Sequence, residues 1–111
     1  MRRLLLPVIV LALAGCGAGT ATPPVPVPTT MVDLPTSYRF APAAITVQAG
    51  ATVTWTNRDN FTHNVTIEGE PALTMAPGEA VSYTFATTGL YAYVCSLHPK
   101  DMQGSVLVTG A

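Results

Sequence analysis

The stretch ITVQAGATVTWTN, residues 45–57, decides the fold class, because its apolar residues recur at every second position. Ile45 and Val47 alternate with polar residues before a glycine-containing turn. Val53 and Trp55 alternate with threonines after it. A period of two places successive side chains on opposite faces of an extended chain, so the stretch predicts two half-buried β-strands separated by a turn.

The same period continues through residues 61–67, 81–85 and 91–95, with Gly, Pro and Asn turn signals between these segments. About seven to eight short strands at this spacing predict an all-β sandwich, and the pattern indicates no helix and no internal repeat. The chain of 111 residues is 49% hydrophobic and 10% charged, which is enough apolar sequence for the core of one domain. Its formal net charge of −1, without a basic stripe, argues against nucleic-acid binding.

The N-terminus has the features of an export signal. Arg2 and Arg3 precede an apolar run over residues 4–14, which ends in the sequence LAGC, and the last residue of that sequence is Cys16. This order resembles the processing site of bacterial lipoproteins, which implies that Cys16 becomes the lipidated first residue of the mature chain. The alternative is a plain signal peptide followed by an incidental cysteine. We expect a signal peptide at 1–15, a Gly/Thr/Pro-rich tether at 16–32 and the folded domain at 33–111, held at the outer face of a bacterial cytoplasmic membrane or in the periplasm.

Lipidation of Cys16 would leave Cys95, the other cysteine of the chain, without an intramolecular partner. A free thiol outside the cytosol oxidises unless it is protected. A bound metal ion is one such protection.

The sequence YVCSLHPKDMQG, residues 93–104, places a thiol, an imidazole and a thioether close together. The alternation places His63 and Cys95 on inward faces near strand ends, so the sandwich could bring them together at one pole. Two imidazoles and a thiolate with a weak thioether are the donors of a blue-copper electron-transfer site. Each residue also has a simpler explanation, because a lone inward His or Cys is usually part of the core and a Met can fill a gap. Together they predict a copper site with the ligands His63, Cys95, His98 and Met102.

The chain resembles the cupredoxin family, in particular plastocyanin-like and amicyanin-like proteins. The resemblance rests on F-x-P at 40–42, G-x-x-V-x-W-x-N at 50–57, H-N-V at 63–65, G-x-Y-x-Y-x-C-x-x-H at 89–98 and M-x-G at 102–104. It implies a Greek-key sandwich, one copper ion on the four ligands named above, and electron transfer as the activity. Three residues separate His98 from Met102, whereas plastocyanins usually have four and amicyanins two, so the axial geometry is open.

Further residues have expected roles around this site. We expect hydrogen bonding around the cysteine loop from Asn64, with Ser96 and Pro99 also surrounding the ligands. An apolar docking patch of Phe61, Leu97 and Pro99 would surround the surface ligand His98 and receive redox partners transiently. The leading hypothesis is a monomeric one-electron carrier rather than an enzyme, because two histidines cannot build a second copper site. The alternative is a chaperone or scavenger that hands over copper itself.

Overall fold

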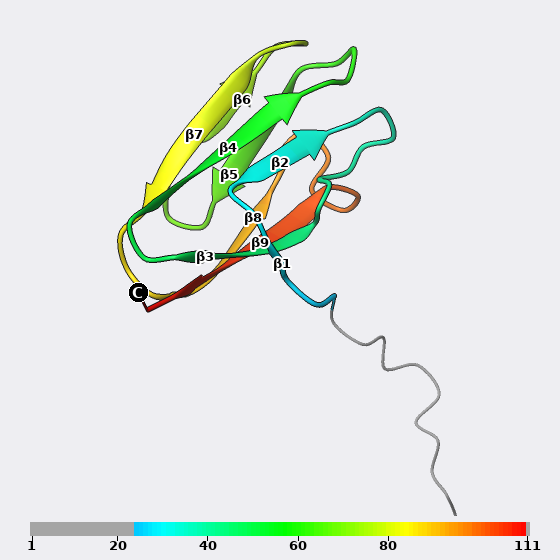
Figure 1. The fold of residues 1–111 in the computed structure, drawn as a ribbon. Coiled ribbons are helices and arrows are strands. Elements are labelled where there is room, and N and C mark those ends of the chain that lie inside the picture. The colour runs from blue at the N-terminus through cyan, green and yellow to red at the C-terminus, as the bar shows by residue number, and fades with distance from the viewer. Residues whose placement is uncertain (1–23, 111) are drawn as a thin grey trace, which may run out of the picture.

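Two β-sheets face each other in the computed structural model of the chain, which describes residues 24–110 (Figure 1). Cys16 and the expected signal peptide lie outside the described residues, so both remain predictions. Within residues 24–110 no helix is long and apolar enough to cross a membrane. The all-β sandwich predicted from the sequence is confirmed.

The larger sheet has six strands in the order β1-β3-β9-β8-β5-β6, and the smaller sheet has three in the order β2-β4-β7. The larger sheet comprises β1 (Val27–Pro28), β3 (Ala44–Gln48), β9 (Gln103–Thr109), β8 (Gly89–Val94), β5 (His63–Ile67) and β6 (Leu73–Met75). The smaller sheet comprises β2 (Met31–Leu34), β4 (Ala51–Asn57) and β7 (Ala80–Phe85). The described residues therefore form nine strands rather than seven or eight, because β1 and β6 are only two and three residues long.

The turn at Gly50 carries the chain from one sheet to the other. Strand β3 pairs in parallel with β9, whereas β4 pairs antiparallel with β7. The backbone N–H of Ala49 donates to Thr109 in the larger sheet, and that of Gly50 donates to Phe85 in the smaller. Gly50 has φ +91°, a left-handed conformation that glycine adopts without a steric penalty. The period-two pattern of this stretch thus belongs to two facing strands that are not paired with each other.

The core fills the space between the sheets with the inward residues of the alternating pattern. Trp55 is fully buried and lies edge-to-face with Tyr93 across the sandwich, with ring centroids 5.4 Å apart. Phe40 packs against the same tyrosine at 4.7 Å, and Phe85 lies 6.4 Å from Trp55. The contact between Trp55 of β4 and Tyr93 of β8 joins the two sheets near the end of β8.

The N-terminal boundary differs from the expected one. The expected tether extended to residue 32, but Val27–Pro28 pairs with β3 and Met31–Leu34 pairs in parallel with β4. Val32 is also buried in the core, because it lies beside Trp55 in the smaller sheet. The sandwich therefore incorporates residues that composition alone assigned to a linker.

Three loops meet at one end of the sandwich, on the right in Figure 1. They are residues 35–39 after β2, residues 58–62 between β4 and β5, and residues 95–102 between β8 and β9. The candidate metal ligands predicted from the sequence lie in or beside the last two of these loops.

Candidate metal centre

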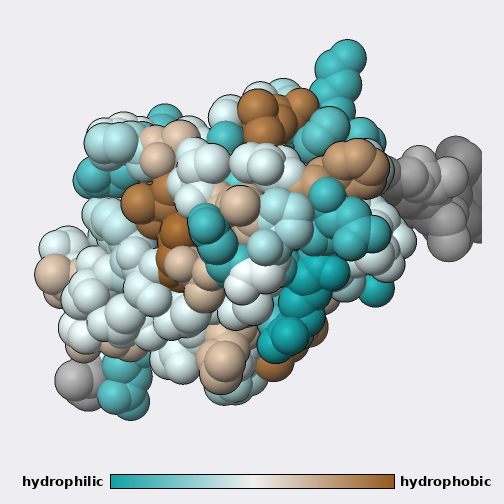
Figure 2. Space-filling model, turned by 90° about the horizontal axis from the view of Figure 1, so that it is seen from above, coloured by the Kyte–Doolittle hydropathy of each residue, from teal (hydrophilic) through white to brown (hydrophobic). Residues whose placement is uncertain are grey.

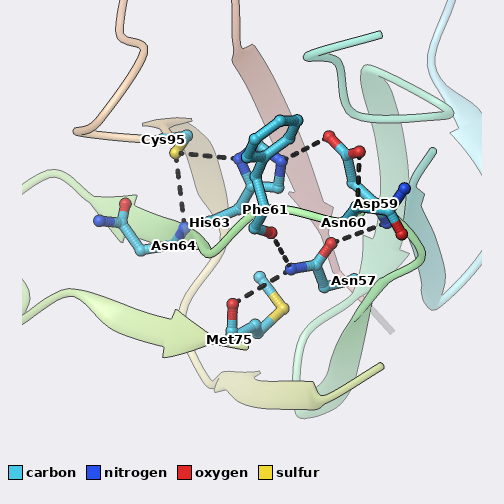
Figure 3. Close-up of polar contacts among 8 residues, drawn as sticks. All are labelled: Asn57, Asp59, Asn60, Phe61, His63, Asn64, Met75 and Cys95. Carbon is cyan, nitrogen blue, oxygen red and sulfur yellow. Dashed lines mark hydrogen bonds and ion pairs between the residues drawn. The ribbon is translucent and has the colours of Figure 1, made fainter. Parts of the chain in front are cut away.

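His63 is the first residue of β5 and its side chain is fully buried at this pole. Its Nδ1 lies 3.8 Å from the Sγ of Cys95, which is also fully buried (Figure 3). Across the strand pair, His63 lies opposite Met75, and both side chains are inside the sandwich. Two of the predicted donors therefore meet although they are 32 positions apart in the sequence.

Asp59 hydrogen-bonds the second nitrogen of the His63 ring. Its Oδ2 lies 2.9 Å from Nε2 of His63, and its side chain is only 5% exposed. The hydrogen bond from His63 lowers the pKa of the Asp59 carboxyl, so the group is a carboxylate near neutral pH. Because a carboxylate only accepts hydrogen bonds, Nε2 is the protonated nitrogen, and in the neutral ring Nδ1 has a free lone pair beside Cys95.

The side chain of Asn57 fixes the loop that carries Asp59. Its Nδ2 donates to the carbonyls of Phe61 and Met75 at 2.8 and 3.1 Å, and its Oδ1 accepts from the backbone N–H of Asp59 at 3.0 Å (Figure 3). Asn57 is fully buried, so each of these bonds satisfies a polar group that water does not reach. The loop therefore holds Asp59 in place against His63.

The loop from Cys95 to Met102 closes on itself through backbone hydrogen bonds. The N–H of Cys95 donates to the carbonyl of Met102 at 3.1 Å, and the N–H of His98 donates to the carbonyl of Cys95 at 3.0 Å. The N–H of Met102 in turn donates to the carbonyl of His98 at 3.0 Å. The Met102 side chain is fully buried. This compact loop thus carries Met102 as a buried side chain at the same end of the sandwich as Cys95.

Asn64 connects β5 to the cysteine loop, as the sequence predicted. Its Oδ1 accepts from the backbone N–H of Ser96 at 2.8 Å, and its Nδ2 donates to the Ser96 hydroxyl at 2.7 Å. Its own backbone N–H points at the Cys95 Sγ at 3.4 Å. Thr66 donates to the same Oδ1 at 3.0 Å. Asn64, the residue after His63, is thereby joined to Ser96, the residue after Cys95, which fixes Cys95 relative to His63.

His98 is only partly buried, in contrast to His63. Phe61 and Leu97 are 55% and 54% exposed, so both lie on the surface as the docking-patch prediction requires. The ring of Tyr38 lies edge-to-face with the His98 imidazole at 4.6 Å and stacks on Phe61 at 5.9 Å. Two imidazoles of unequal exposure thus lie side by side, 5.9 Å between ring centroids.

Two expectations around the site need correction. The alternation over residues 61–67 would put Phe61 on the inward face with His63, but β5 begins only at His63 and the Phe61 side chain lies on the surface, as the docking-patch prediction requires. Pro99 is exposed, and its carbonyl accepts a hydrogen bond from the Gln103 side chain at 3.0 Å, so within the described residues no hydrogen bond connects it to a candidate ligand. Its other predicted position, on the docking patch, agrees with this exposure.

Sequence reasoning missed three residues of the site: Asn57, Asp59 and Tyr38. The one available signal for Asp59 is its spacing four positions before His63 within a loop. Tyr38 lies in a loop whose conformation no periodic pattern describes.

The donors fit a copper ion by their chemistry, and their spacing fits a metal ion. A nitrogen and a sulfur that bind one ion at the bond lengths known for zinc, about 2.0–2.1 Å and about 2.3 Å, are about 3.8 Å apart when the angle between the two bonds is about 120°. That value agrees with the 3.8 Å between His63 Nδ1 and Cys95 Sγ. Among residues 24–110 no three His, Cys, Asp or Glu side chains converge as a closed metal cluster. Of the other predicted donors, His98 lies nearby, with its ring centroid 5.9 Å from that of His63.

Comparisons with known proteins agree with this donor chemistry. Residues 30–109 match the family described as copper binding proteins, plastocyanin/azurin family. The plastocyanin of Scenedesmus fuscus is 36% identical over 83 residues, which span 62% of this chain and 85% of that protein. The amicyanin of Paracoccus denitrificans is 44% identical over 69 residues, spanning 56% of this chain and 52% of that protein.

Solved structures show the same fold. A purple cupredoxin from Nitrosopumilus maritimus superimposes with a TM-score of 0.65 at 26% identity, covering 71% of this chain and 98% of that one. A Cu(I) form of an amicyanin variant superimposes with a TM-score of 0.63 at 36% identity, covering 71% of this chain and 80% of that one.

Proposed function

Because the chain belongs to the plastocyanin/azurin family of copper-binding proteins, we propose that it carries single electrons through one bound copper ion. The observation that supports this most strongly is the approach of the buried His63 Nδ1 to the buried Cys95 Sγ. An imidazole nitrogen suits Cu(II) and a thiolate suits Cu(I), so the pair accommodates both oxidation states.

The proposed ligands are the four donors predicted from the sequence, His63, Cys95, His98 and Met102. Bound copper supplies a one-electron couple between Cu(I) and Cu(II). The protein holds the donors in fixed positions, since Asp59 orients the His63 ring and Asn64 joins the cysteine loop to β5. Fixed donors reduce the rearrangement that accompanies each electron transfer.

Electron exchange with partners takes place beside His98 in this proposal. His98 is the candidate ligand nearest the surface, and exposed apolar side chains lie around it, among them Phe61 and Leu97. Viewed from above, the surface shows hydrophobic residues as a few separate areas among pale and hydrophilic ones (Figure 2). A small apolar contact with few charges favours the brief encounters that an electron carrier requires.

We also propose export and lipid attachment through Cys16. The LAGC sequence supports this proposal. Mass spectrometry of the membrane fraction tests it. An unmodified Cys16 in a freely soluble form would contradict the anchor without affecting the copper site.

Repeated redox cycling separates electron transfer from copper delivery. We expect the Cu(II)-loaded protein to be reduced and reoxidised many times with a constant potential and full retention of copper in the presence of a Cu(I) chelator. Burial of His63, Cys95 and Met102 favours retention, because a competing ligand in solution does not reach these side chains. Loss of the metal to the chelator within the first reduction would instead support a copper chaperone or scavenger. We do not expect a catalytic activity, because the chain has no histidine left for a second copper site.

A further inference from the structure

The backbone of the loop before Phe40 is strained at two successive residues. Ser37 has φ 111° and Tyr38 has φ 52°, and neither is a glycine. L-residues occupy this region at a cost, which is greatest for bulky side chains, and such strain persists only where the surrounding structure compensates for it. The compensation has to come from contacts that these residues make.

The contacts of Tyr38 are aromatic and are made with residues of the candidate metal centre. The Tyr38 ring lies edge-to-face with His98 at 4.6 Å and with His63 at 5.8 Å, and it stacks on Phe61 at 5.9 Å. Its hydroxyl makes no hydrogen bond to the described part of the chain, so the ring carries the interaction. Tyr38 is partly buried, which is consistent with a ring lying over its neighbours.

Among residues 24–110, no side chain hydrogen-bonds or ion-pairs with the His98 imidazole. His63 has Asp59 on Nε2, whereas the imidazole of His98 has no hydrogen bond or ion pair there and its ring contacts are with Tyr38 and His63. We propose that Tyr38 is a positioning residue for His98, and that its ring takes the place that a hydrogen-bonding carboxylate has beside His63. This inference rests on the proposed role of His98 as a copper ligand.

The conformation of the loop is consistent with this role. A left-handed residue at position 38 reverses the chain, so that the ring lies against His98 while Phe40 enters the core two residues later. An edge-to-face aromatic contact corresponds to about two- to tenfold in an equilibrium constant. We expect an effect of that size on the affinity of the site for the imidazole at position 98.

The test measures that affinity directly. In a His98→Gly background loaded with Cu(II), free imidazole is titrated while the visible spectrum is recorded. Adding Tyr38→Gly, which removes the ring and suits the positive φ, should weaken imidazole binding by about two- to tenfold. Adding Tyr38→Phe instead should leave it unchanged, because the ring remains. Ser37→Gly is the matched control, since it relieves strain in the same loop and keeps the ring.

A second measurement uses the metal-free protein with His98 intact. Nuclear Overhauser contacts and ring-current shifts should connect the His98 ring to Tyr38, persist in Tyr38→Phe, and disappear in Tyr38→Gly. Their absence from the parent protein would overturn the inference.

The outcomes distinguish this inference from the proposed function. Imidazole that binds equally well with and without the Tyr38 ring contradicts the positioning role alone, and so does a loss in Ser37→Gly as large as that in Tyr38→Gly. Imidazole that has no effect even beside Tyr38 contradicts the ligand role of His98, and this inference then fails with it.

Discussion

Replacing Asn64 with alanine should destabilise the metal-free protein and loosen the cysteine loop together. The change removes three hydrogen bonds: Ser96 N–H to Oδ1 at 2.8 Å, Nδ2 to the Ser96 hydroxyl at 2.7 Å, and the Thr66 hydroxyl to Oδ1 at 3.0 Å. A neutral hydrogen bond contributes about 1 kcal/mol net. The free energy of unfolding should therefore fall by about 2–3 kcal/mol.

Two variants that each remove one of these hydrogen bonds calibrate this value. Ser96→Ala removes only the Nδ2 bond, and Thr66→Val removes only the hydroxyl bond, so each should cost about 1 kcal/mol or less. Urea unfolding of the metal-free proteins gives the free energies. The rate at which a thiol reagent modifies the buried Cys95 reports local opening, and it should rise more in Asn64→Ala than in either control.

The comparison also provides the refutation. An Asn64→Ala protein no less stable than Ser96→Ala, with an unchanged thiol reaction rate, would show that the bonds to Ser96 and Thr66 do not hold the loop. The backbone bond from Asn64 to the Cys95 sulfur remains in every variant, so it cannot account for a difference among them.

Three further predictions concern residues below and beside the site. Gly104→Ala should lower the free energy of unfolding by about 1–3 kcal/mol, because the new Cβ would clash with the Tyr93 ring. Gly110→Ala, with open space around it, should be neutral in the same urea titration. Asp59→Asn should raise the potential of the copper-loaded protein in voltammetry, because a neutral amide stabilises Cu(II) through His63 less than a carboxylate does. Asp101→Asn, on the exposed part of the loop, is the control and should leave the potential nearly unchanged. An unchanged potential in Asp59→Asn would contradict the role of Asp59. Burial raises the pKa of Tyr93 to about 12. Since the tyrosine of the unfolded chain loses its proton near pH 10, the free energy of unfolding should fall as the pH rises from about 10 to 12. Tyr93→Phe should remove this part of the pH dependence in urea unfolding titrations.

The strands were predictable because period two is a direct consequence of the pleat. The pattern over Val53 and Trp55 gave the correct inward faces in β4. The same pattern failed at Phe61, because Asn57 binds the Phe61 carbonyl and keeps the chain in a loop until His63. The alternation of apolar residues does not show where a side chain will hydrogen-bond to the backbone and so delay the start of a strand.

The candidate site was predictable where its donors are local in sequence or lie at strand ends. Cys95, His98 and Met102 share one short loop, and the sandwich brings His63 to it. Asp59 and Tyr38 were not predictable in this way, because loop geometry places them: Asp59 through its bond to Asn57, and Tyr38 through a left-handed backbone that its residue type does not favour. The sequence spacing therefore indicated the donors but not the residues that orient them.

The visible spectrum of the protein loaded with one equivalent of Cu(II) tests the central claim most directly. A thiolate ligand at Cys95 should give an intense blue, green or purple charge-transfer band, and Cys95→Ser should abolish the band while the circular dichroism of the β-sheets persists. A parent protein that stays colourless with stoichiometric Cu(II), or a Cys95→Ser protein that keeps the band, would contradict the assignment of Cys95 and with it the proposed copper centre.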